Sequence, residues 1–70
     1  MPKPIKTSVI ISTLTKNGFI LISQKGSHTK YRKINGKTLN VIVPIHGKEI
    51  AYSTFKSITK QSEIDMTKFN

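Results

Sequence analysis

Residues that could do chemistry are concentrated in one stretch, Gln-Lys-Gly-Ser-His-Thr-Lys-Tyr-Arg, which runs from position 24 to position 32. Its imidazole, on His28, follows a Gly-Ser turn, and cations lie close by at Lys25, Lys30 and Arg32. Histidine ordinarily titrates near neutral pH, so it can move protons under cellular conditions. Neighbouring cations attract phosphate and can hold it in place. A proton-transfer group beside a phosphate clamp predicts phosphodiester chemistry.

If the phosphodiester belongs to RNA, its cleavage needs few catalytic groups, because the 2′-hydroxyl of RNA is itself the nucleophile. The reaction requires a base for the 2′-hydroxyl proton, an acid for the 5′-oxygen and stabilisation of the charge on the phosphorane. One histidine can perform one of the proton transfers, which accelerates the reaction by about 10² to 10⁴. We assign His28 to the 2′-hydroxyl side, and the acid role stays open to it. Water, Tyr31 and His46 are the candidates for the second transfer.

A period-two alternation from His28 to Lys33 predicts a strand that carries Lys30 and Arg32 on the same face as His28. These two cations can therefore reach the same phosphate, which makes them better candidates than Lys33 on the other face. The predicted phosphate-binding residues are, in chain order, Lys25, Ser27, Lys30 and Arg32, and the secondary candidates are Tyr31, His46 and Lys48.

Both histidines and the lysine run also have simpler explanations. From spacing alone, His28 is more often a solvated turn residue than a catalyst, and the lysines are more often a solvated charged face. For His46 the better explanation is a loop histidine bonded to backbone, and the alternatives are a phosphate contact or a docking point for a partner.

Composition narrows the classes of partner and fold. The 70 residues, which predict a single domain over 1–70, include 12 Lys+Arg against 3 Asp+Glu, for a formal net charge of +9 and a pI near 10.2. This imbalance predicts a polyanionic partner: nucleic acid first, an acidic protein second and an anionic membrane third. There is no cysteine, so apolar packing must stabilise the small core.

Several classes of site are not expected. Two histidines and three acids without cysteine offer no familiar spacing of metal ligands, and no motif for a small-molecule cofactor is present. The longest apolar runs are far below the roughly 20 residues of a membrane span. Ser12, Thr13 and Lys16 interrupt the N-terminal apolar run, which argues against a signal peptide, so the expected location is the cytoplasm.

Regular elements must position the candidate site. Pro2 and Pro4 predict that residues 1–6 form a flexible N-terminus outside regular structure. The β-branched residues of 7–16 favour a strand, but Ile10, Ile11 and Leu14 follow helical spacing. Thr7 or Ser8 could cap this segment and Asn17-Gly18 resembles a helix C-cap, so a helix is predicted.

Three strands and a second helix are predicted after it. Phe19–Ser23 is apolar enough for a largely buried strand, residues 28–33 and 38–43 form the next two, and Asn35-Gly36 is a hairpin signal. Ser53 could cap a helix to about Gln61 that buries Phe55 and Ile58, and Asp65 could cap a last turn that folds Phe69 onto the core. The predicted fold is α+β, with order α-β-β-β-α and both helices on one face of a three-stranded antiparallel sheet.

Four segments carry a resemblance to a known family: Leu-Thr-Lys-Asn-Gly-Phe at 14–19, Gly-Ser-His-Thr-Lys-Tyr at 26–31, Val-Pro-Ile-His-Gly-Lys-Glu-Ile at 43–50 and Thr-Phe-Lys-Ser-Ile at 54–58. In these segments the chain resembles the HicA toxin family, across roughly residues 7–69. Its most specific parts are the Gly-Ser-His turn and the Val-Pro-x-His-Gly-Lys segment. Ala51-Tyr52 departs from the usual turn residues before the second helix.

The resemblance implies a fold similar to the double-stranded-RNA-binding domain. It also implies an mRNA interferase, the toxin of a type II toxin–antitoxin system, which cleaves mRNA and inhibits translation. The family's catalytic histidine falls on His28. The implied partners are RNA and a HicB-type antitoxin that masks His28.

Two other functions compete with this one. A non-catalytic RNA-binding module of the same fold would read duplex shape from basic helix surfaces, whereas the cations here concentrate on predicted strands and turns. A pure interaction protein would use its basic surface only to dock an acidic partner. Phe19 and Phe55 are assigned to the core, and Tyr31 and Tyr52 stay open as residues that could stack on bases.

Overall fold

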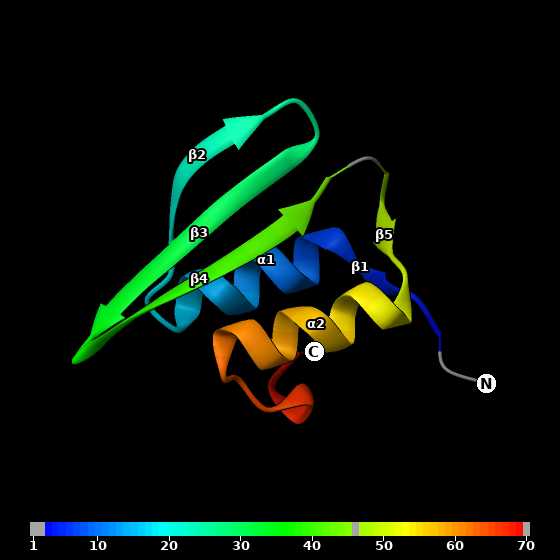
Figure 1. Ribbon diagram of the computed structural model, residues 1–70. Helices are drawn as coiled ribbons and strands as arrows, with labels where there is room; N and C mark the ends of the chain where they lie inside the picture. Colours follow the sequence, from blue (N-terminus) through cyan, green and yellow to red (C-terminus); the bar gives the residue numbers. More distant parts are fainter. Residues whose placement is uncertain (1–2, 46, 70) are drawn as a thin grey trace.

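The computed structural model describes residues 3–45 and 47–69. In chain order its elements are β1 (Ile5–Lys6), α1 (Thr7–Lys16), β2 (Ile20–Lys25), β3 (His28–Asn35), β4 (Lys37–Pro44), β5 (Glu49–Ile50), α2 (Tyr52–Ser62) and the 3-10 turn η1 (Met66–Lys68). The long strands form an antiparallel sheet in the order β2-β3-β4. Both helices lie on one side of it (Figure 1), which confirms the predicted α-β-β-β-α fold.

The core lies between the two helices and the inner face of β3 and β4. Alternate residues of these strands point into it, and the aromatic rings of Phe55 and Phe69 meet edge to face with centroids 5.1 Å apart. Phe69 thus folds back on the core, as predicted. The buried apolar side chains are Ile10, Leu14, Phe19, Tyr31, Val41, Val43, Ile50, Phe55, Ile58 and Phe69.

The segment 7–16 is helical despite its β-branched residues, as predicted. Ile10 and Leu14 are completely buried, so tertiary packing outweighs the modest intrinsic preference of β-branched residues for strands. The helix ends at Asn17, whose backbone N–H donates to the carbonyls of Thr13 and Leu14. Gly18 follows with φ of 93°, a conformation that glycine adopts without strain.

The predicted side-chain caps of the two long helices are wrong. The N-cap positions are Lys6 for α1 and Ala51 for α2, and neither makes a side-chain cap hydrogen bond. Thr7 is already inside α1, where its backbone N–H donates to the carbonyl of Lys48 at 2.9 Å. The segment before β5 therefore accepts a bond from the start of α1. The predicted Asp65 cap is confirmed, because its carboxylate accepts a bond from the backbone N–H of Thr67.

Sequence patterns also missed a short second sheet. Ile5 pairs with Ile50 and Lys6 with Glu49, in antiparallel register. The expectation that residues up to Lys6 lie outside regular structure is therefore wrong for Ile5 and Lys6. The pairing residues are more than forty positions apart in sequence, and two-residue strands carry too little periodicity to be recognised.

The prediction of a largely buried strand at 19–23 is correct only for Phe19, which is 1% exposed. All six residues of β2 are exposed, and Ile20 and Leu21 retain 65% and 50% of their accessible surface. β2 is an edge strand, and the helices pack on one face of the sheet only. An apolar run is buried throughout only where both faces of its strand are covered.

Tyr31 generates a prediction about alkaline stability. The residue is 6% exposed, and burial raises the pKa of its hydroxyl above the usual value. Because the unfolded tyrosine ionises first, the stability that the neutral buried ring contributes is lost as pH rises above about 10. We expect Tyr31→Phe to lose less stability than the wild type between pH 9 and pH 11, measured by urea unfolding at each pH. Identical alkaline losses in the two proteins would contradict this.

Candidate functional site

His28 is the first residue of β3 and directly follows the turn that joins β2 to β3. Gly26 makes this turn with φ of 61°, in the left-handed region that side chains disfavour. In the sheet, His28 lies opposite Lys25 on β2 and opposite Pro44 on β4. The imidazole is thus placed on the central strand, exposed, with a lysine as its cross-strand neighbour.

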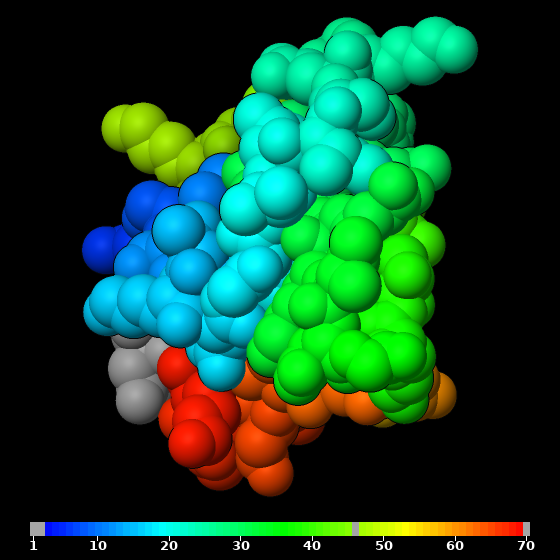
Figure 2. All heavy atoms as spheres, turned by 90° about the vertical axis from the view of Figure 1, so that its left-hand side faces the viewer, coloured from blue at the N-terminus to red at the C-terminus, as the bar shows by residue number. Residues whose placement is uncertain are grey.

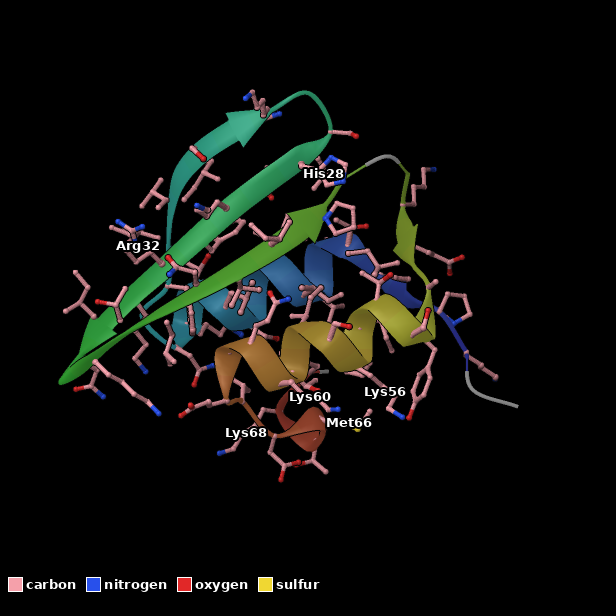
Figure 3. All side chains as sticks on the ribbon, viewed as in Figure 1. His28, Arg32, Lys56, Lys60, Met66 and Lys68 are labelled. Atoms are coloured by element: carbon pink, nitrogen blue, oxygen red, sulfur yellow. The ribbon has the colours of Figure 1, made fainter. Side chains whose placement is uncertain are left out.

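The faces of β3 are fixed by its alternation. Thr29 and Tyr31 are buried against the helices, so His28, Lys30 and Arg32 lie on the opposite, open face of the sheet. This confirms the predicted shared face. Alternate residues along a strand are about 7 Å apart. Figure 3 shows His28 near the start of β3 and Arg32 farther along the strand. The cations therefore form a row that leads away from the imidazole.

Arg32 is held in place by a neighbour that sequence reasoning missed. Its Nε donates a hydrogen bond to Oδ1 of Asn40 on β4, at 2.8 Å. This bond uses one of the five guanidinium N–H donors. The signal for Asn40 was present in the sequence, because a hairpin turn that pairs residue 35 with residue 37 also pairs 32 with 40.

The turn before His28 is tied to the segment after β4. The backbone carbonyl of Ser27 accepts a hydrogen bond from the backbone N–H of Ile45 at 2.6 Å. Lys25 is exposed at the end of β2, while Lys30 is half-buried and lies opposite Ser23 and Ile42. Of the predicted phosphate-binding cations, Lys25 and Lys30 therefore lie nearest to His28 along the sheet, and Arg32 lies two residues beyond Lys30 on β3.

The secondary candidates lie in different places. Tyr31 points into the core from the face opposite His28, so its side chain does not share the open face with the imidazole. His46 lies outside the described residues. Lys48 is exposed and lines a groove of about 710 Å³ beside the start of α1, together with Ile45 and Gly47. Tyr52 is half-buried at the start of α2, where its ring lies 6.1 Å from that of Phe55.

The three long strands carry no acidic residue of their own, and a carboxylate reaches them at Lys37, at the hairpin end of β4. Glu63, after α2, accepts a bond from the Lys37 ammonium at 2.7 Å. The Asp65 carboxylate accepts hydrogen bonds from the backbone N–H and the hydroxyl of Thr67. The backbone bond is the main reason that the pKa of this carboxyl is lowered. Glu49 lies in β5. The cations beside His28 therefore have no carboxylate on their own three strands that could compete with an anionic ligand.

Residues 3–45 and 47–69 offer neither a metal site nor a membrane-spanning helix. In that part of the chain no three histidine, cysteine, aspartate or glutamate side chains gather closely enough to hold a metal ion. No helix there is long and apolar enough to cross a membrane, since α1 and α2 have 10 and 11 residues against the roughly 20 required.

Comparison with known protein families supports the resemblance noted in the sequence. The family model of the HicA toxins of bacterial toxin–antitoxin systems matches residues 8–64. The matched span begins in α1 and ends just after α2, so it includes the Gly-Ser-His turn and the whole three-stranded sheet. No curated protein shows significant similarity to the chain.

The turn before His28 supplies a prediction about folding. A Cβ atom added to Gly26 would meet nothing within 4 Å, so substitution there is opposed by its left-handed backbone alone. We expect Gly26→Ala to lower the free energy of unfolding by about 1 kcal/mol. Gly26→Asn should cost less, because asparagine tolerates this conformation. Urea unfolding of the three proteins measures both effects, and equal losses for alanine and asparagine would contradict the assignment.

Proposed function

Because the chain belongs to the HicA family of toxins from bacterial toxin–antitoxin systems, we propose that it is an endoribonuclease that cleaves mRNA and thereby blocks translation. The observation that carries this proposal is the position of His28, on an open sheet face beside Lys25 and Lys30. An imidazole surrounded by cations matches the needs of RNA cleavage. The proposed site of action is the cytoplasm, where mRNA is found.

In the proposed reaction His28 accepts the proton of the ribose 2′-hydroxyl as the oxygen attacks the adjacent phosphorus. The 5′-oxygen leaves with a proton, and the products are a 2′,3′-cyclic phosphate and a free 5′-hydroxyl. Lys25, Lys30 and the backbone around Ser27 stabilise the additional negative charge on the phosphorane. Arg32, fixed by Asn40, binds a phosphate farther along the strand. The reaction needs no metal or other cofactor, since RNA carries its own nucleophile.

The second proton transfer has fewer candidates than the sequence allowed. Tyr31 is buried on the other face, which leaves water and His46. His46 follows Ile45, whose backbone N–H bonds to the turn that carries His28. The microscopic assignment of base and acid can be exchanged between His28 and the second group without a change in products.

A toxin of this class works with an antitoxin. We propose a HicB-type protein that binds over His28 and so prevents RNA from reaching it. The strands around His28 are basic and contain no acidic residue. An acidic antitoxin surface would therefore be attracted over a distance, which speeds association.

One observation supports the runner-up, a non-catalytic RNA-binding module. Lys56 and Lys60 are exposed one turn apart on α2, on the side away from the sheet (Figure 3). Such a basic helix surface is what a reader of duplex RNA uses. A non-catalytic RNA-binding module gives His28 no catalytic role, so substitution of His28 distinguishes the two functions.

Removal of the imidazole tests the proposed function. We expect wild-type protein to arrest growth and deplete mRNA when induced in a bacterium, and His28→Ala to do neither. With purified protein and RNA in EDTA, the substitution should lower the cleavage rate about 10²-fold or more. RNA with a deoxyribose at the cleaved position should resist both proteins, since the nucleophile is then missing.

Lys56→Ala/Lys60→Ala serves as the matched control, because it removes two exposed cations remote from the candidate site. It should retain cleavage near the wild-type rate. The proposed nuclease function is contradicted if His28→Ala cleaves RNA normally. It is also contradicted if both variants arrest growth while mRNA stays intact. A loss of RNA affinity in the lysine variant, together with wild-type affinity in His28→Ala, would favour the binding module.

A further inference from the structure

The open face of the sheet carries apolar side chains that neither the core nor the candidate site explains. Ile20 and Ile34 are 65% and 75% exposed, and Ile42 is 39% exposed. Ile20 lies opposite Arg32, and Ile34 lies two residues beyond Arg32 on the same strand, so both point to the face that carries His28. We call Ile20 and Ile34 the isoleucine surface, whereas Ile42 lies opposite Lys30 and so closer to His28.

The isoleucine surface and His28 lie toward opposite ends of that face. His28 begins β3, and Ile34 is six residues farther along, a separation of about 20 Å. Ile20 and Ile34 are diagonal neighbours on adjacent strands, which brings their side chains within reach of each other. Figure 2 looks onto the end of the molecule where the β3–β4 hairpin closes, and there β2 (cyan) and the hairpin (green) form one continuous surface.

Apart from the phosphate proposed for Arg32, RNA is a poor match for this end of the sheet. Single-stranded RNA is held by aromatic side chains that stack on bases. Of the aromatic residues, Phe19, Tyr31, Phe55 and Phe69 are buried and Tyr52 lies on α2, so none is exposed on the open face. Isoleucine offers neither a ring nor a hydrogen bond to a base.

A protein is the better match. Exposed apolar side chains clustered on one face are typical of protein interfaces, and an exposed apolar edge strand otherwise invites aggregation. Lys30 and Arg32 lie among the isoleucines, and no acid lies on these strands. The complementary surface is therefore apolar at its centre and bordered by carboxylates.

We propose that the isoleucine surface is the docking site of the antitoxin, which anchors there through apolar side chains and acidic residues and extends along the face to cover His28. The identity of this occupant rests on the proposed function. Binding energy and inhibition then come from different ends of the face. Loss of the isoleucines should release the toxin from control without impairing cleavage.

The test removes apolar surface while keeping β-branched residues in the strands. We expect Ile20→Thr/Ile34→Thr to weaken the complex with the purified antitoxin about 100-fold in Kd, roughly tenfold for each side chain. RNA cleavage by the isolated variant should equal that of the wild type. In cells, co-expressed antitoxin should rescue growth from the wild type but not from the variant.

Leu21→Thr is the matched control, because Leu21 is 50% exposed on the same strand but lies opposite Tyr31, on the other face. It should bind the antitoxin as the wild type does. Thermal unfolding shows that each variant is folded, and Ile34→Thr alone replaces the double variant if that one is unstable. It should weaken binding about tenfold.

The outcomes separate the two proposals. Unchanged antitoxin binding by a folded isoleucine variant overturns the docking site, whatever the activity of the toxin. Impaired RNA cleavage with unchanged antitoxin binding overturns it as well and assigns the surface to RNA. If the wild type does not cleave RNA, the proposed nuclease function is contradicted. The measurement of antitoxin binding still tests whether the isoleucine surface is the docking site.

Discussion

The register of β3 in the centre of the sheet is the constraint on which the rest of the structure depends. Thr29 and Tyr31 are buried, and Thr29 Oγ1 donates to the carbonyl of Val43 at 2.8 Å, a buried bond between β3 and β4. A slip of one residue would turn His28, Lys30 and Arg32 into the core. Burying those polar groups without partners costs several kcal/mol. The core thus enforces the outward direction of the candidate site.

Coverage of one face only has a second consequence. A chain of 70 residues with two helices of 10 and 11 residues covers one side of its sheet and leaves the other side exposed. The outer edge of β4 is partly closed by α2, where Gln61 Oε1 accepts a bond from the N–H of Ile42 at 3.0 Å. Among the residues that the structure describes, no strand pairs with the outer side of β2. Ile20 of β2 therefore lies beside cations on the face that carries His28, so one surface offers both positive charge and apolar area.

Much of this arrangement could be predicted from local patterns. Helical spacing identified α1, Asn35-Gly36 fixed the hairpin, and alternation from His28 put the cations on one face. The errors occurred where the deciding contacts are distant in sequence. Thr7 does not cap α1 because it bonds to the segment around Lys48, and Ile5 pairs with Ile50, forty-five positions away.

The sequence by itself determined the order of the elements, the face shared by His28, Lys30 and Arg32, and the excess of positive charge. These properties depend on residue type and on the two-residue period of a strand, both of which are local. Only the tertiary structure decided which apolar residues are buried. Phe19 and Ile20 are adjacent and equally apolar, yet one is 1% and the other 65% exposed. The difference arises because the helices pack against a single face, and no local pattern specifies which side of a strand its neighbours will cover.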